Sequence, residues 1–194
     1  HDLVDFHVDF AASEPDLIRV QYRDMWSLAP ESARRVRRLQ RQYVEIWTDA
    51  LTALGSAAAE RLAGRPAPTI LTPHSGEFDR MFGAGDAAKP DRTLAAARAT
   101  GAVIVHKGAD TVVAAPDGRI AAKSDAPTWL ATAGTGDVLA GLTGARLAAG
   151  LDPFEAVCQA VWLHARVAEL AGPAFIADDL VPLVPRAIGE CLTR

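Results

Sequence analysis

The sequence predicts an α/β protein: an α-helical N-terminal segment followed by a three-layer domain with a mostly parallel sheet and flanking helices. Short apolar runs rich in β-branched residues alternate with helical patterns after residue 68. The breaker cluster Gly64–Pro68 precedes that alternation and marks a boundary. A glycine-rich turn at Gly134–Asp137 opens an apolar helix, as expected where a helix start binds phosphate. We therefore divide the chain into a segment at 1–63 and a domain at 64–194.

The first segment is predicted to be helical from Glu31 to Leu62, where apolar residues recur at helical spacing after Pro30. Arginines crowd the start of this helix, but acidic residues offset them and no aromatic residues alternate with them. We interpret the arginines as a solvated helix face and expect no nucleic-acid partner.

Four strands are predicted in the domain. Thr69–Thr72 and Val103–Val105 are too short for helices, and the second is rich in β-branched residues. Pro116-Asp117-Gly118 has the chemistry of a turn, and the flanking runs Thr111–Ala115 and Arg119–Ala122 are the arms of a β-hairpin.

Five helices accompany these strands, and capping residues set several of their ends. The fourth has Asp152 as its N-cap, and Pro185 should bend the fifth. Their predicted positions are a start at Phe78–Phe82, then Arg92–Thr100, then Gly136 to Gly150, then Asp152 to Gly172, and finally a helix beginning after Asp178.

Composition excludes some classes of function. The net charge of −4 and the pI near 5.7 give no general attraction to nucleic acid or to an anionic membrane. No run is long enough to span a membrane, and no signal peptide is visible. Cys158 and Cys191 lie in apolar helical patterns, so we expect buried free thiols and a cytoplasmic protein.

The segment Gly134-Thr135-Gly136-Asp137 carries the main chemical signal. Its glycines let the backbone approach a phosphate, and the amino end of the following helix attracts the anion. An aspartate here would repel a phosphate that is only bound, but it suits a base acting on a hydroxyl beside a transferring phosphoryl group. Asp137 is therefore the predicted catalytic residue, and an ordinary helix cap is the alternative.

Two further motifs follow predicted strands, which is where open α/β sheets bind ligands. Lys107 can meet a phosphate as a point charge, and Thr111 offers a hydroxyl. The alternative for this loop is a tight connection with a surface lysine. His74 and Glu77 bracket a glycine after the first strand, and a lone histidine of this kind is more often structural than catalytic.

Together the motifs resemble the C-terminal half of the bacterial ADP-dependent NAD(P)H-hydrate dehydratases, which have a ribokinase-like fold related to that of carbohydrate kinases. The resemblance extends from about Pro68 to Thr193 and predicts a partial fold of that type. It rests on the stretches Leu71–Phe78, Lys107–Thr111, Leu130–Gly141, Gly150–Ala156 and Ala177–Leu180.

The resemblance implies a lyase for metabolite repair. ADP, or ATP, phosphorylates hydrated NADH or NADPH, elimination restores the cofactor, and Mg²⁺ accompanies the chemistry. It also implies that His74 and Asp137 contact the hydrated substrate, with Asp137 as the base. The implied nucleotide-binding residues are Lys107, Gly108, Ala109, Asp110, Thr111, Gly134, Thr135 and Gly136, and no residue is assigned to a metal.

The chain departs from the family pattern in three ways. Ala133 stands where glycine is usual, Ser75 stands where proline is usual, and the family's N-terminal half is missing. The stretches His7–Phe10, Glu14–Gln21 and Arg37–Trp47 are instead similar to the ligand-binding domain of TetR-type transcriptional regulators. We expect a fusion, a rearranged gene product or a fragment. The missing half would leave a sheet edge and an apolar face open, and we expect the segment Glu31 to Leu62 to cover part of them and a homo-oligomer to cover the rest.

Two alternative functions stay open. A small-alcohol or vitamin kinase of the same superfamily would use the same chemistry at Asp137. A non-catalytic protein, either a regulator fragment or a nucleotide-binding domain without turnover, gains weight from the missing half, which would also impair a dehydratase.

Overall fold

The computed structural model describes residues 29–32, 34–36, 38–39, 42 and 67–192. The chain divides into two compact units, His1–Ala53 and Leu54–Arg194. In the first unit every described position between 30 and 42 is helical, in agreement with the helix predicted after Pro30. The remainder of that helix and the stretches His7–Phe10 and Glu14–Gln21 lie outside the described residues.

The second unit is built on a four-stranded sheet in the order β1-β2-β3-β4. β1 (Ile70–Leu71) runs parallel to β2 (Val103–His106), whereas β3 (Thr111–Ala114) is antiparallel to β2 and to β4 (Ile120–Lys123). The expectation of a mostly parallel sheet is therefore wrong for the described strands. A parallel crossover needs a dozen or more residues, and the short turns that lead into and out of β3 allow only antiparallel pairing.

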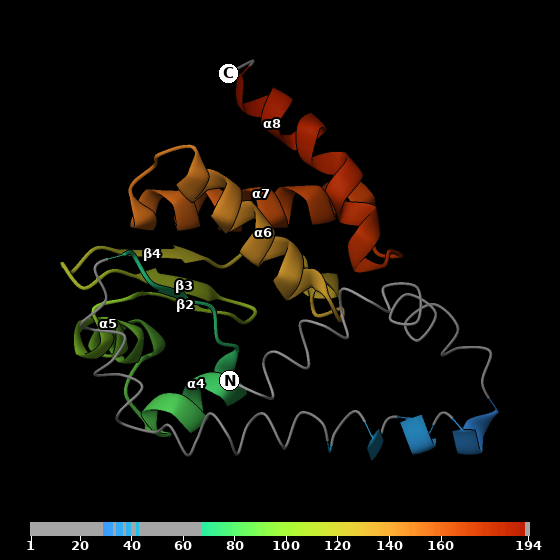
Figure 1. Cartoon of the computed structure of the whole chain (residues 1–194), viewed down its shortest axis with the longest axis horizontal. Coiled ribbons are helices and arrows are strands. Elements are labelled where there is room, and N and C mark those ends of the chain that lie inside the picture. Colours follow the sequence, from blue (N-terminus) through green and yellow to red (C-terminus); the bar gives the residue numbers. More distant parts are fainter. Residues whose placement is uncertain (1–28, 33, 37, 40–41, 43–66, 193–194) are drawn as a thin grey trace. The chain divides into compact units, whose positions relative to one another are not determined.

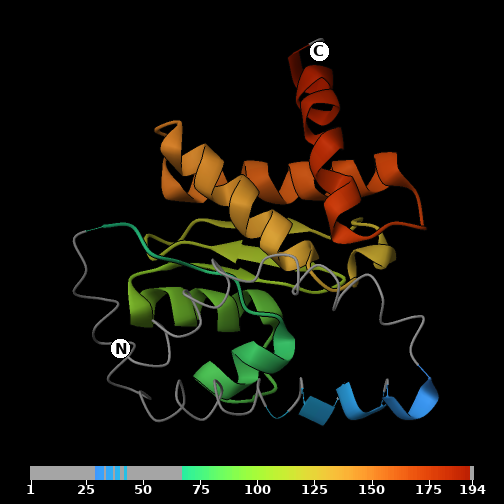
Figure 2. The same cartoon turned by 45° about the vertical axis from the view of Figure 1, so that its right-hand side comes forward.

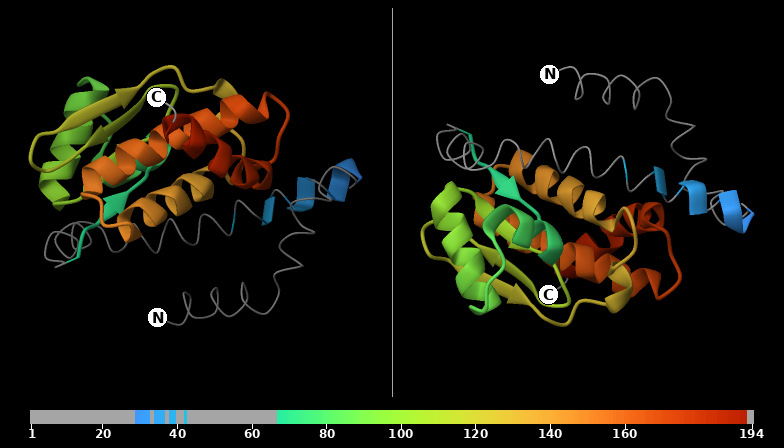
Figure 3. Two further views of the ribbon diagram at one scale, coloured as in Figure 1. Left: turned by 90° about the horizontal axis from the view of Figure 1, so that it is seen from above. Right: turned by 90° about the horizontal axis from the view of Figure 1, so that it is seen from below.

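Helices cover both faces of this sheet. α4 and α5 lie on one face, and α6 and α7 lie on the other with α8 packed against α7 (Figure 1). The view in Figure 2 and the two opposite views in Figure 3 show the same layering. The bounds are α4 Ser75–Phe82, α5 Lys89–Thr100, α6 Thr135–Ala148, α7 Pro153–Ala171 and α8 Val184–Leu192, with 3-10 turns at Thr128–Leu130 (η2) and Ala177–Leu183 (η3).

Two apolar clusters hold the layers together. One joins Val103, Val105 and Val113 of the sheet to α6 and α7, and the other joins Ile104 and Ala114 to α4 and α5. Consecutive residues of β2 thus belong to different clusters, because side chains alternate between the two faces of a strand. Burial on both faces explains why β2 is apolar throughout most of its length.

Several predicted helix ends shift in the structure. α4 begins at Ser75 rather than at Phe78, because His74 caps it, and α5 begins at Lys89 rather than at Arg92. The last predicted helix is divided into η3 and α8. Pro185 lies in the first turn of α8, where its missing N–H is not needed, and the change from η3 to α8 comes directly before it.

The cap predicted at Asp152 is confirmed, since its carboxylate accepts hydrogen bonds from the backbone N–H groups of Phe154 and Glu155. Both cysteines are free, but only Cys158 is partly buried. Cys191 is exposed on α8, so the expectation of burial is wrong for it. None of the described helices is long and apolar enough to cross a membrane.

Candidate functional site

The predicted motifs meet at the carboxyl ends of β1 and β2. β1 leads through Pro73 to His74, and β2 leads directly to Lys107. His74 and Lys107 form a parallel backbone bridge, and the Lys107 N–H donates to the Pro73 carbonyl at 2.8 Å. The two motifs therefore lie side by side, although many residues separate them in the sequence.

The Lys107 side chain reaches the start of α6. A Cβ placed on Gly136 would lie 3.3 Å from Lys107 Nζ, so the ammonium lies against the first turn of this helix. The Glu77 carboxylate stands 4.0 Å from the same ammonium. The positive end of the helix and the ammonium thus converge, and together they would stabilise an anion such as a phosphate.

The glycine-rich turn has a conformation that its sequence requires. Gly134 is the N-cap of α6 with φ +86°, and a Cβ on it would lie 3.0 Å from the Cβ of Ala177. Thr135 is buried, and its hydroxyl donates to the carbonyls of Leu130 at 2.7 Å and Thr132 at 2.9 Å. The glycine is needed for backbone conformation and space, and the threonine fixes the turn from within.

The alanine at position 133 fits this turn. Ala133 is exposed, and every described residue with positive φ is a glycine. The departure from the family's usual glycine therefore introduces no left-handed alanine.

Asp137 is exposed in the first turn of α6, directly after Gly136. Its N–H donates to the Gly134 carbonyl at 3.0 Å. The cap position belongs to Gly134, so Asp137 is not the helix cap that was the alternative prediction. Its carboxylate lies on the same helical turn as the Gly136 position that Lys107 approaches.

His74 has a structural task as the N-cap of α4. Its Nδ1 accepts a hydrogen bond from the Glu77 N–H at 3.1 Å, and Glu77 Oε2 accepts one from the His74 N–H at 2.8 Å. Glu77 Oε1 lies 3.3 Å from His74 Nε2. Because Nδ1 is an acceptor here, a neutral His74 carries its proton on Nε2.

Glu77 thus joins the site through both His74 and Lys107, and the sequence prediction did not assign it. A signal was available, because a polar N-cap followed three residues later by glutamate is the capping-box pattern.

The loop after Lys107 is held by its own contacts and by Lys89. The Thr111 hydroxyl donates to the Gly108 carbonyl at 3.3 Å. Lys89 Nζ donates to the Asp110 carboxylate at 2.9 Å, and this hydrogen bond lowers the pKa of Asp110. Gly108, Ala109 and Asp110 are exposed, so the loop is open to a ligand. Lys89 was not predicted, because a lysine at the start of a helix carries no local signal.

A buried histidine, His106, ends β2 directly before Lys107. His106 is 2% exposed and stacks on Phe78 with ring centroids 4.1 Å apart. Its ring nitrogens lie 3.2 Å from the hydroxyls of Thr93 and Ser75. Burial, followed by the charges of Lys89 and Arg92, lowers the pKa of His106 to about 4. The serine that replaces the family's usual proline therefore contacts a neutral core histidine.

A second histidine, His164 of α7, lies behind the first turn of α6. Burial lowers its pKa to about 4; the Thr135 backbone opposes this shift and the charge of Lys107 adds to it. Its Nε2 is buried and has no hydrogen-bond partner among the described residues. The sequence prediction did not include it, because a lone histidine in an apolar helix is most often a core residue.

Within the described part of the chain, no group of three or more His, Cys, Asp or Glu side chains could hold a metal ion. In phosphoryl-transfer sites Mg²⁺ commonly has one or two carboxylate ligands together with the phosphates of the substrate. The exposed carboxylate of Asp137, beside the candidate anion position, could serve as such a single carboxylate ligand.

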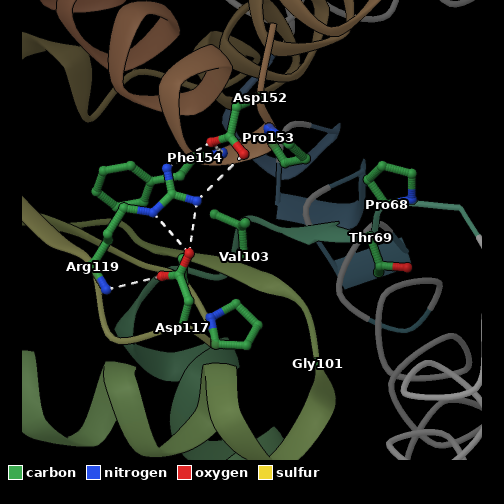
Figure 4. A pocket seen from close by; sticks show the side chains of 11 residues that line it. Pro68, Thr69, Gly101, Val103, Asp117, Arg119, Asp152, Pro153 and Phe154 are labelled. Carbon is green, nitrogen blue, oxygen red and sulfur yellow. Dashed lines mark hydrogen bonds and ion pairs between the residues drawn. The ribbon is translucent and has the colours of Figure 1, made fainter.

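A cavity of about 270 Å³ lies at the opposite end of the sheet (Figure 4). It is lined by the starts of β1 and β2, the β3–β4 turn and the start of α7. Its charged groups satisfy one another, since Arg119 donates to both Asp117 and Asp152 at 2.8 Å. The carboxyl end of the sheet, with Lys107 and Asp137, is therefore the better candidate for a ligand site.

Fold and site together define a ribokinase-like α/β protein with a candidate anion site at a helix start. A ribokinase-like protein from Enterococcus faecalis shares the fold, with 23% identity, a TM-score of 0.58 and coverage of 68% of this chain and 48% of that one. The model of the NAD(P)H-hydrate dehydratase family matches residues 36–186, and the chain belongs to this family. The resemblance predicted from the sequence is confirmed.

Individual relatives agree with this assignment. The bifunctional NAD(P)H-hydrate repair enzyme of Salinibacter ruber is 40% identical over 84% of this chain and 32% of its own length. The ADP-dependent (S)-NAD(P)H-hydrate dehydratase of Neisseria meningitidis is 43% identical over 69% of this chain and 49% of its own length. A Bacillus subtilis ADP/ATP-dependent NAD(P)H-hydrate dehydratase, co-crystallised with ATP and Mg²⁺, is 36% identical with a TM-score of 0.60, covering 66% of this chain and 52% of that one.

The chain thus spans between a third and about half of the length of these relatives. A model of the tetracyclin repressor-like C-terminal domain matches residues 1–70, as the TetR-type resemblance predicted, and overlaps the dehydratase match.

Proposed function

We propose that this chain carries out the ADP-dependent dehydration of hydrated NADH or NADPH, or contributes the nucleotide-binding part of the site for that reaction. The observation that carries the proposal is the position of the Lys107 ammonium against Gly136 in the first turn of α6. Membership of the dehydratase family supplies the reaction, and two relatives are named for their use of ADP.

In this proposal the phosphates of ADP bind between Lys107 and the first turn of α6. Gly108, Ala109, Asp110 and Thr111 line the adenylate side, and Gly134 to Gly136 line the phosphate side. Any side chain on Gly136 would meet Lys107 Nζ, so glycine at this position lets the ammonium and the helix end approach the same phosphate.

Asp137 is the proposed base. It accepts the proton of the substrate's hydroxyl group while that oxygen bonds to the terminal phosphorus of ADP, and AMP leaves. The carbon–oxygen bond then breaks, phosphate departs with the bonding electrons, and the neighbouring carbon loses a proton to restore the ring double bond. Mg²⁺ would neutralise phosphate charge, and the nucleotide would supply most of its ligands.

His74 is proposed to contact the hydrated dinucleotide beside Asp137. The Glu77 N–H donates to Nδ1 of His74, so the imidazole has a fixed orientation at the end of β1. Glu77 also stands 4.0 Å from Lys107, so it links the proposed substrate and nucleotide halves of the site.

We also propose the domain division and assembly that the sequence predicted. Residues 64–194 would form the partial ribokinase-like domain, and residues 1–63 a helical segment derived from a TetR-type ligand-binding domain. Among the described strands β1 pairs with β2 alone, so its outer edge is open to a second copy. Light scattering that shows a monomer at micromolar concentration would count against the homo-oligomer.

The test of the reaction uses chemically hydrated NADH with ADP and Mg²⁺. Recovery of the near-ultraviolet absorbance of reduced nicotinamide, with release of AMP and phosphate, is the expected result. The Asp137→Asn variant lacks the proposed base, so its turnover should fall about 100-fold or more while its ADP binding stays intact. Asp91→Asn, in the first turn of α5, is the matched control and should retain activity.

Other outcomes would identify other functions. Accumulation of a phosphorylated product without reduced nicotinamide would indicate a kinase. ADP binding without any turnover would indicate a non-catalytic nucleotide-binding domain. Undiminished turnover by Asp137→Asn would show that the base is another residue.

A further inference from the structure

Lys89, the first residue of α5, directs its side chain into the loop that follows β2. Its Nζ donates to the carboxylate of Asp110 at 2.9 Å and also to the Asp110 carbonyl. A third and longer contact, 3.5 Å, joins it to the carbonyl of Lys107. One ammonium therefore bonds both ends of the four-residue connection between β2 and β3, and its side chain is only 17% exposed.

The loop is shaped around this ammonium. A Cβ on Gly108 would lie 2.7 Å from Lys89 Nζ, closer than real Cβ atoms come to other groups. Gly108 has no unusual φ, so what the glycine provides is the space that the ammonium fills, and a Cβ here would have to displace the flexible end of Lys89. The hydrogen bond also holds Asp110 ionised, because Lys89 lowers the pKa of this carboxyl group.

We propose that Lys89 is a positioning residue for nucleotide binding: it fixes the loop so that Lys107 extends from its first position toward Gly136. Neither the family match nor the sequence motifs assign it. Lys89 neutralises Asp110, whose charge would otherwise oppose the phosphates, and leaves the Lys107 ammonium to meet them. The inference rests on the proposed function, because it names the residue that prepares the same site.

The experiment measures binding of ADP and of adenosine by calorimetry with the full-length chain. Lys89→Met keeps the apolar stem and removes the ammonium, and we expect it to weaken ADP binding about tenfold, the equivalent of one charge-assisted hydrogen bond. Adenosine affinity should change much less, because it has no phosphate to meet Lys107. A purely structural role would weaken both ligands equally. Arg119→Met is the control, since it removes a paired cation at the other end of the sheet.

Gly108→Ala tests the same contact from the other side. Its methyl group should displace the flexible end of Lys89 and weaken ADP binding in an otherwise native chain. In a Lys89→Met background the same change should have little further effect, because the atom it displaces is gone. Additive effects of the two substitutions would overturn the inference, since Gly108→Ala would then block the nucleotide directly.

The outcomes separate this inference from the proposed function. ADP binding by Lys89→Met that equals the wild-type value refutes the role of Lys89 alone. Wild-type chain that binds no ADP refutes both. If Lys89→Met does not fold, two other variants, Lys89→Arg and Gly108→Ala, test the inference. The positioning role is supported if Lys89→Arg retains ADP affinity and Gly108→Ala loses it. Any other combination opposes it.

Discussion

Acidification should destabilise the second unit through His106, which is buried as a neutral imidazole. The ring is 2% exposed, stacks on Phe78 and lies within hydrogen-bond distance of two hydroxyl groups. Its pKa is about 4 in the folded chain, against 6.5 for an unperturbed histidine. The unfolded state therefore binds more protons between these two values, and stability is present above pH 6.5 and is lost as the pH falls toward 4.

The size of the effect follows from the two pKa values. Between about pH 7 and about pH 5, His106 should account for a loss of roughly 2 kcal/mol in the free energy of unfolding. The pKa of His164 is lowered similarly, so this residue should add its own loss in the free energy of unfolding on acidification. Both losses should reverse on return to neutral pH.

Urea denaturation at the two pH values measures this loss. His106→Gln should be less stable at neutral pH, because it loses the stack on Phe78, yet it should lose less stability on acidification than the wild type. The difference between the two pH dependences should be about 2 kcal/mol. His164→Gln is the matched comparison and should keep the pH-dependent loss of stability that comes from His106. A His106→Gln variant with the full wild-type pH dependence would refute the reasoning.

Two predictions concern stability alone and use chemical denaturation at neutral pH. Gly134→Ala should cost about 1–3 kcal/mol, because an alanine would have to adopt φ +86° and approach Ala177. Gly144→Ala, inside the same helix with open space around it, should instead gain up to about 1 kcal/mol, and equal effects at the two glycines would contradict this account. Asp152→Ala should cost about 1 kcal/mol through loss of the α7 cap, while Asp152→Asn should retain most of that stability. A larger loss in the asparagine variant would mean that the ion pair with Arg119 matters more than the cap.

The order of the elements in the second unit was predictable because local chemistry specifies it. Pro116-Asp117-Gly118 forms the tip of the β3–β4 hairpin, as its turn residues indicate. Asp152 caps α7, and β2 is buried along its whole length, as an apolar β-branched run suggests. The start of α4 was placed too late because His74, a less common N-cap, takes the place usually filled by serine or aspartate.

The candidate site was predictable only in part. Lys107, Gly134 and Gly136 were identified because backbone freedom and charge near a helix start are properties of short motifs. Lys89 and His164 were not, because each contacts a motif from a helix that is distant in the sequence. Glu77 lies within a motif, but its proximity to Lys107 could not be predicted. Their roles depend on contacts between α4, α5, α7 and the loops, and such contacts have no spacing rule in the chain.

The type and order of the elements in the second unit, the glycines of the Gly134–Asp137 turn and the family of the chain could all be inferred from the sequence. These features depend on residues close together in the chain, where propensity, capping and turn geometry act. The antiparallel pairing of β2 with β3 and the meeting of Lys107 with Gly136 are properties of the folded chain. So are the use of Lys89 and the neutral state of His106. Those properties arise from packing and burial, which bring distant residues together and change their charge energetics.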